Sequence, residues 1–181
     1  RGDLMHGYIE KFLKKENLKP QEGTDKAYEM AKVIIKNGLE NNLEEIWKTE
    51  AVLYFPDRYL GITDLVGIMN SKTTIIDYKQ SNNPKQEKYC DDYFLQLAAY
   101  ILAHDRVYNT KISQGIILLA TESFMFQRFV LDGEKLEKVW KKHKFDLEEF
   151  RKLEQQKQEM ELLFESTKQK GDFDFAAKLQ Y

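Results

Sequence analysis

The sequence predicts an α/β protein built on a central mixed sheet with helices on its faces. Two observations carry this prediction. β-Branched and aromatic residues gather in five short runs, whereas apolar residues recur at helical spacing in the segments around them. The resulting order is two helices, three strands, one helix, two strands and a final helix. Such an order favours one sheet covered by helices, because each element must bury its apolar side against another layer.

The first elements are predicted to be two helices. Apolar residues at positions 4, 5, 8, 9, 12 and 13 share one face of the first helix. The second helix opens at Gly23-Thr24-Asp25, where Thr24 is a candidate cap, and ends at Asn37-Gly38.

The five strands and the remaining helices follow from turn signals and spacing. The first three strands form a meander over 51–55, 59–69 and 73–78, with turns at Pro56-Asp57 and Asn70-Ser71. A polar loop over 81–91 leads to a helix that ends near Val107. Two more strands over 112–121 and 124–131 precede a charged helix that begins at Asp132 and runs past Arg151.

Composition limits the class of protein. The chain has 181 residues, 42% of them hydrophobic, and no apolar run approaches the roughly 18 to 20 residues of a membrane span. A lone cysteine, Cys90, excludes an internal disulfide and a thiolate zinc site. The missing apolar run predicts no membrane association, and the single cysteine and the missing secretory signal pattern predict an intracellular, reducing compartment. The net charge of −2 means that nucleic acid would have to bind a local patch.

Two acids stand inside apolar strands. Asp64 lies within the run 60–67 and Asp77 within 75–79, and a buried carboxylate is costly unless a cation or several donors compensate it. On adjacent strands of a hairpin, two such acids can converge on one metal ion. Because side chains alternate along a strand, Asp77 and Lys79 share one face while Tyr78 points to the other. The alternative is a structural salt bridge between Asp77 and Lys79 with Asp64 as a turn acid.

Further polar residues occur at intervals along the chain. Glu50 interrupts the first strand, His6 and Glu10 lie one turn apart on the first helix, and Gln96 and Tyr100 share one face of the third helix. Each is ordinary by itself. Their order along the chain is specific.

This order resembles the PD-(D/E)XK nuclease superfamily in its RecB-type branch, and within that branch it looks like the exonucleases of mitochondrial genome maintenance and related phage and bacterial exonucleases. The resemblance covers residues 2 to about 152. The matching positions are Gly2, His6 and Glu10 on the opening helix, Glu50 on the first strand, Gly61 and Asp64 in Gly-x-x-Asp, Asp77, Lys79 and Ser81 in Asp-x-Lys-x-Ser, and Gln96 and Tyr100 in Gln-x-x-x-Tyr. Gln80 stands where threonine is common in the family.

The resemblance implies a restriction-endonuclease-like three-layer αβα sandwich. We expect a nuclease domain over 1–155, which includes the first two helices (1–38), and a charged helical tail over 156–181. The implied activity is a divalent-metal-dependent DNA exonuclease that acts on single-stranded ends, as a monomer, in a bacterial or phage-infected host cytoplasm or in a mitochondrion. Two alternatives stay open: a structure-specific endonuclease of the same fold, and a non-catalytic nucleic-acid-binding module whose acids are structural.

The resemblance also implies residue roles. Asp64 and Asp77 are the expected ligands of Mg²⁺ or Mn²⁺, with the Tyr78 carbonyl and Glu50 as further oxygen ligands. His6 would add a nitrogen ligand, which favours manganese. The remaining catalytic residues are Lys79, which would orient the attacking water, and Gln96 and Tyr100, which would position Lys79 and the substrate strand.

DNA contacts are expected around the polar loop. Lysines there can meet phosphates, and aromatic rings can stack on unpaired bases with little sequence preference. The expected DNA-binding residues are Ser81, Lys85, Lys88, Tyr89 and Tyr93. The last helix carries five lysines and one glutamate between Lys135 and Lys144, which fits either a solvated face or a phosphate track.

Overall fold

The computed structural model describes residues 2–55, 58–142, 156 and 159–167. The chain divides into two compact units, Arg1–His143 and Lys144–Tyr181. In the second unit, residues 159–167 are helical. The first unit contains α1 (Gly2–Leu13), α2 (Asp25–Ile34), the π-helical turn η1 (Ile35–Leu39), β1 (Leu43–Phe55), β2 (Arg58–Met69), β3 (Lys72–Ser81), the 3₁₀ turn η2 (Glu87–Tyr89), α3 (Asp91–Tyr108), β4 (Gln114–Thr121), β5 (Phe126–Asp132) and α4 (Gly133–Lys142).

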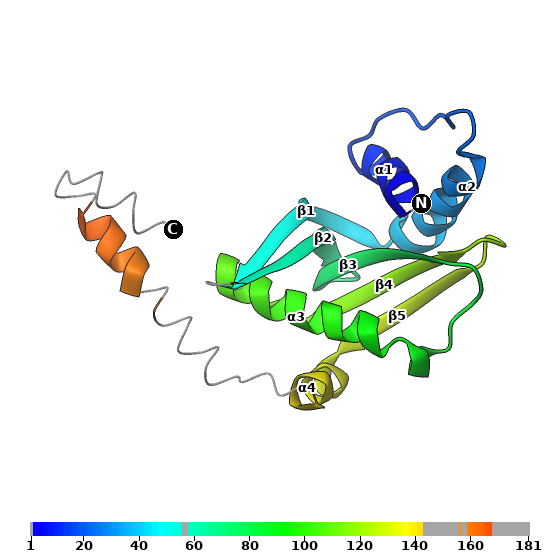
Figure 1. Ribbon diagram of the computed structural model, residues 1–181. Helices are drawn as coiled ribbons and strands as arrows, with labels where there is room; N and C mark the ends of the chain where they lie inside the picture. The colour runs from blue at the N-terminus through cyan, green and yellow to red at the C-terminus, as the bar shows by residue number, and fades with distance from the viewer. Residues whose placement is uncertain (1, 56–57, 143–155, 157–158, 168–181) are drawn as a thin grey trace. The chain divides into compact units, whose positions relative to one another are not determined.

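The five strands form one mixed sheet in the order β1-β2-β3-β4-β5. Neighbouring strands are antiparallel except β3 and β4, which run parallel. A parallel pair needs a long crossover, and α3 supplies it. Helices α1 and α2 cover one face of the sheet and α3 covers the other (Figure 1). The predicted α/β class and layered sandwich are therefore confirmed.

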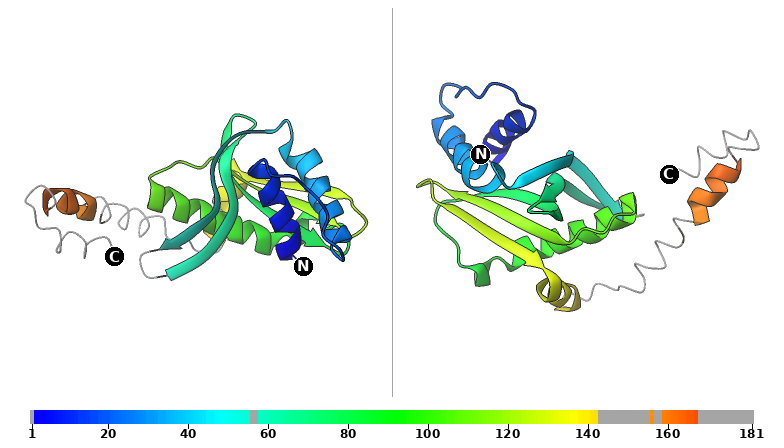
Figure 2. Two further views of the ribbon diagram at one scale, coloured as in Figure 1. Left: turned by 90° about the horizontal axis from the view of Figure 1, so that it is seen from above. Right: turned by 180° about the vertical axis from the view of Figure 1, so that it is seen from behind.

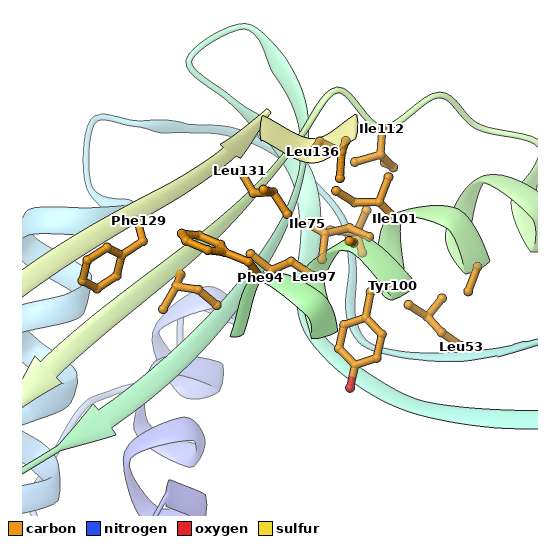
Figure 3. Packing of buried hydrophobic residues seen from close by; sticks show 14 of the residues in the cluster. Leu53, Ile75, Phe94, Leu97, Tyr100, Ile101, Ile112, Phe129, Leu131 and Leu136 are labelled. Carbon is orange, nitrogen blue, oxygen red and sulfur yellow. The ribbon is translucent and has the colours of Figure 1, made fainter. Parts of the chain in front are cut away.

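Side-chain alternation divides the core into two clusters. Ile75 of β3 packs toward α3, whereas the next residue, Ile76, packs toward α1 and α2. The cluster beneath α3 includes Phe94, Leu97 and Ile101 (Figure 3). The strand face that carries odd-numbered β3 residues therefore looks toward α3.

Strand β2 separates from β3 halfway along its length. Their pairing ends at Leu65 and Ile76, while β2 continues to pair with β1 as far as Arg58 and Phe55. The β1–β2 hairpin thus leaves the rest of the sheet (Figure 2). Beyond Ile76, the pairing described for β3 is with β4 on one side. This divergence opens the sheet at the position of Asp64 and Asp77.

Some predicted boundaries were wrong. Strand β1 begins at Leu43 rather than at residue 51, because cross-strand pairing with β2 holds a charged, largely exposed stretch that local propensity does not favour as strand. Thr24 makes no capping hydrogen bond to α2, because its hydroxyl donates to the Gln21 carbonyl and lies 2.6 Å from the Tyr8 hydroxyl. The turn at Pro56-Asp57 and the last helix beyond Lys142 lie outside the described residues.

Within the described ranges, no helix is long and apolar enough to cross a membrane.

Candidate active site

Asp64 lies in the opening between β2 and β3. Its Oδ2 accepts a hydrogen bond of 2.8 Å from the backbone N–H of Tyr78, a group that pairing with β2 would otherwise satisfy. The same oxygen lies 3.1 Å from Nε2 of His6 on α1. The Asp64 side chain therefore connects β2 to β3 at the point where they diverge, and it also contacts α1.

Asp77 is the more deeply buried acid, with 3% of its surface exposed. Its Oδ1 accepts hydrogen bonds from the backbone N–H of Asp64 at 3.3 Å and from the Thr63 hydroxyl at 3.4 Å. Burial raises the pKa of Asp77 from 3.8 to about 6, and the negative charge of Asp64 adds to this effect while Lys79 opposes it. Asp64 and Asp77 therefore lie together at a site where burial makes a negative charge on Asp77 unfavourable.

Lys79 stands beside this pair on the face that looks toward α3. Its Nζ lies 4.0 Å from Oδ2 of Asp77 and donates a hydrogen bond of 2.8 Å to Oε1 of Gln96. The Gln96 amide donates in turn to the Tyr100 hydroxyl at 3.1 Å. The lysine is thus held by a chain of polar contacts that begins in α3.

Tyr100 is positioned by the core beneath α3 and by a glycine on β2. Its ring belongs to the apolar cluster, and its hydroxyl points away from that cluster (Figure 3). Gly61 has a φ of +150°, and a Cβ at this position would lie 2.5 Å from the Tyr100 hydroxyl oxygen. A side chain at position 61 would therefore displace the end of the contact chain that holds Lys79.

A model of the PD-(D/E)XK nuclease superfamily matches residues 8–179. The chain belongs to this superfamily. The match includes Asp64, Asp77, Lys79 and Gln96 and begins two residues after His6.

Curated relatives are similar over part of their length. Mitochondrial genome maintenance exonuclease 1 of Xenopus tropicalis is 34% identical over 110 residues, which are 58% of this chain and 31% of that protein. The Homo sapiens protein of the same name is 29% identical over 164 residues, which are 83% of this chain and 45% of that protein. The chain therefore spans less than half the length of these relatives.

One solved structure supports the fold. A candidate exonuclease from Eubacterium rectale superimposes with a TM-score of 0.52 and 13% identity, over 85% of this chain and 66% of that one. At this identity the likeness shows the fold alone.

This PD-(D/E)XK chain brings most of the predicted site residues together. Hydrogen bonds connect His6 with Asp64, and Asp64 with Asp77 and Tyr78, and an ion pair connects Asp77 with Lys79. Gln96 and Tyr100 continue the series. Thr63 also belongs to it, although the sequence did not single it out. Its only signal was a hydroxyl next to Asp64 in an otherwise apolar strand.

Glu50 is not joined to the other acids in this structure. Its side chain is exposed and its φ is +50°, a conformation that few residues other than glycine adopt. The β1–β2 register pairs Thr49 with Leu65 and Ala51 with Thr63, so Glu50 falls level with Asp64. On the same strand, the Thr49 hydroxyl donates a 2.8 Å hydrogen bond to Glu10 of α1. Glu50 therefore lies near the opening between β2 and β3 without contacting Asp64 or Asp77.

The residues expected to bind DNA surround the loop after β3. Two lysines lie over the ring of Tyr93. The Nζ of Lys79 is 5.2 Å from the ring centroid, and the Nζ of Lys85 is 5.0 Å from it. Lys88 lies over Tyr89, whose exposed fraction is 70%. The Ser81 hydroxyl donates to the Asn83 carbonyl at 2.7 Å.

A cavity of about 330 Å³ lies where β3 ends, and neither Asp64 nor Asp77 lines it. Gln80, Ser81 and Asn82 line it where β3 ends, and Thr24, Ala27 and Met30 line it from the side of α2. Its location at the carboxyl end of a parallel pair is typical of ligand sites in α/β sheets.

The donor set suits a hard divalent cation. Among the described residues, no three His, Cys, Asp or Glu side chains are arranged to hold a metal ion. Nevertheless, Asp64 and Asp77 are two carboxylates held close together, and burial, with the negative charge of Asp64 beside it, raises the pKa of Asp77. Carboxylate and carbonyl oxygens are the ligands that Mg²⁺ and Mn²⁺ accept. The residues present therefore fit such an ion.

Proposed function

We propose that this chain is a divalent-metal-dependent DNA exonuclease that hydrolyses phosphodiester bonds from single-stranded ends. The observation that carries the proposal is the approach of Asp64 and Asp77 at the point where β2 leaves β3, with Lys79 on the same face. Membership of the PD-(D/E)XK superfamily and similarity to mitochondrial genome maintenance exonuclease 1 support it.

Asp64 and Asp77 would hold Mg²⁺ or Mn²⁺, together with the Tyr78 carbonyl. In a strand, the N–H and C=O of one residue point toward the same neighbour, so the carbonyl of Tyr78 faces the side on which its N–H meets Asp64. His6 would add a nitrogen ligand, since its ring already touches Asp64. Glu50 would join directly or through water, given its place level with Asp64 in the register.

The bound cation would lower the pKa of a water and neutralise charge on the phosphate. The protein groups provide orientation. Lys79 donates hydrogen bonds to the attacking water and to the phosphate, because its ammonium is directed across the site by Gln96. Tyr100 fixes Gln96 in turn, so the two α3 residues act on the reaction through Lys79.

The single strand would run along the loop after β3. Lys85 and Lys88 are suited to phosphates, and Tyr89 and Tyr93 present ring surface to unpaired bases. Ser81 shares the face of Asp77 and Lys79 by strand alternation and borders the cavity, where it can contact the strand beyond the scissile bond. We propose a monomer, working in a mitochondrion or in a bacterial or phage-infected host cytoplasm.

The test uses labelled single-stranded DNA in linear and circular forms, with 5′- and 3′-blocked linear versions, in Mg²⁺, Mn²⁺ or EDTA. We expect metal-dependent cleavage of linear DNA, lost when the correct end is blocked. Rapid cleavage of the circle would instead support a structure-specific endonuclease. Binding without cleavage in either metal would support a non-catalytic nucleic-acid-binding module.

A further inference from the structure

The side chain of Gln127 fastens the loop after β3 to the sheet at Lys85. Gln127 of β5 accepts the backbone N–H of Lys85 with its Oε1 and donates from its Nε2 to the Lys85 carbonyl, both at 2.8 Å. One amide thus satisfies both backbone groups of Lys85, as a neighbouring strand would. The loop backbone is therefore fixed at Lys85 specifically.

The position of Gln127 follows from the sheet register. Lys79 of β3 pairs with Leu119 of β4, and Leu119 pairs with Gln127 of β5. The three residues form one row, and Gln127 shares its face with Phe129 and so with the core beneath α3. Two strand spacings, about 10 Å, separate Gln127 from Lys79. The amide therefore anchors the loop on the face that carries the catalytic lysine.

This anchor sets where the Lys85 side chain can reach. Its ammonium lies over the same Tyr93 ring as that of Lys79, so the two ammonium groups are no farther apart than the sum of their distances to that ring. Among the described residues, Lys85 forms no ion pair, whereas Lys79 faces Asp77. Because both ammonium groups lie near one ring, they can contact phosphates within one short stretch of a single strand.

We propose that Gln127 is a positioning residue that holds Lys85 where it binds a phosphate next to the scissile one. This inference rests on the proposed nuclease function. A fixed loop backbone lowers the ordering cost of that contact, because less freedom is lost when DNA binds. Gln127 contacts Lys85 and would not contact the DNA itself. Replacing Gln127 should therefore weaken substrate binding rather than slow the chemical step.

The test is Gln127→Leu, which keeps the size of the side chain and removes both hydrogen bonds. The loop remains held by Lys135, whose Nζ lies 2.6 Å from Glu87, so we expect the fold to persist. With Mg²⁺ and linear single-stranded DNA, KM should rise about two- to fivefold while kcat stays within twofold. With Ca²⁺ in place of Mg²⁺, the slope of log Kd against log salt should fall by about 0.7, the contribution of one phosphate on single-stranded DNA.

Lys85→Ala should give the same two changes, and the double variant should be no worse than Lys85→Ala, because Gln127 acts through Lys85. Gln86→Leu is the matched control: it is the same substitution in the same loop, and it should leave KM and the salt slope unchanged. Additive effects in the double variant, a loss in kcat alone, or an unchanged slope in Gln127→Leu would overturn the inference. A wild-type protein that neither binds nor cleaves DNA would overturn the proposed function as well.

Discussion

At the scale of single residues, Lys79 is the group whose loss should separate catalysis from folding. It contacts Asp77 and Gln96 from the edge of the site rather than from within the core. Lys79→Ala should lower kcat about 10²- to 10³-fold, because it removes a donor to the developing charge, and should leave the thermal transition nearly unchanged. Single-turnover cleavage beside calorimetry measures both. Lys111→Ala, an exposed lysine outside the site, is the control, and normal turnover in Lys79→Ala would return Lys79 to a structural salt bridge.

The raised pKa of Asp77 predicts a stability that depends on pH. In the folded protein the pKa is about 6, above its value of 3.8 when unfolded, so the protonated form is favoured by folding. This stabilisation is fully present below pH 3.8 and is lost as the pH rises through 6. Asp77→Asn resembles the protonated form, so without metal it should be more stable than wild type at pH 7, by about 3 kcal/mol at most.

Urea denaturation in EDTA at pH 7 and pH 4 checks this prediction. The difference between Asp77→Asn and wild type should shrink at the lower pH, where the wild-type carboxyl is itself protonated. A variant less stable than wild type at pH 7 would mean that the Asp77 carboxylate is already compensated in the metal-free protein.

At the scale of elements, the contact between β2 and α3 fixes the position of Lys79. Gly61→Ala would bring a Cβ against the Tyr100 hydroxyl and should displace Gln96 and Lys79 with it. We expect a loss of about tenfold or more in kcat/KM, since a small misplacement is costly in a preorganised site. Tyr100→Phe removes the clashing oxygen, so Gly61→Ala combined with Tyr100→Phe should lose less than the two single losses together. Fully additive losses would show that Gly61 and Tyr100 act separately.

His6 of α1 lies 3.1 Å from Asp64 of β2, and this contact predicts a metal preference. The helix is packed independently by Met5 and Ile9, which are fully buried, so His6→Ala should fold normally. Because imidazole suits transition metals, the variant should bind Mn²⁺ more weakly while Mg²⁺ binding changes less. Calorimetric titration of both ions compares them. An equal response to the two metals would remove His6 from the ligand set.

The elements also show what the sequence could and could not predict. Helical spacing located α1 and α3, and the alternation around Asp77 placed it beside Lys79, because these signals are local. The early start of β1 and the separation of β2 from β3 depend on pairing between distant segments, so propensity does not reveal them. The hydrogen bonds between Gln127 and Lys85 join residues 42 positions apart in the sequence, so no local sequence pattern predicts them.

At the scale of the whole molecule, the proposed attraction for DNA would have to be local. The formal charge is −2, and the lysines of α4 are partly engaged, since Lys135 pairs with Glu87 and Lys142 with Asp91. Under the proposed function, the two site carboxylates place negative charge where the phosphate would lie. Without a cation the site should therefore repel the strand, and a bound divalent ion should reverse the local sign.

The central claim is that Asp64 and Asp77 hold a cation that meets the scissile phosphate, and fluorescence anisotropy with a labelled single-stranded oligonucleotide tests it most directly. The titrations compare wild type and Asp77→Asn at one fixed salt concentration, with EDTA or with Ca²⁺, which neutralises the same charges while supporting little cleavage. Wild type should bind more tightly in Ca²⁺ than in EDTA. In EDTA, Asp77→Asn should bind at least as tightly as wild type, because one repelling charge is gone. Much weaker binding by Asp77→Asn in EDTA would contradict the claim.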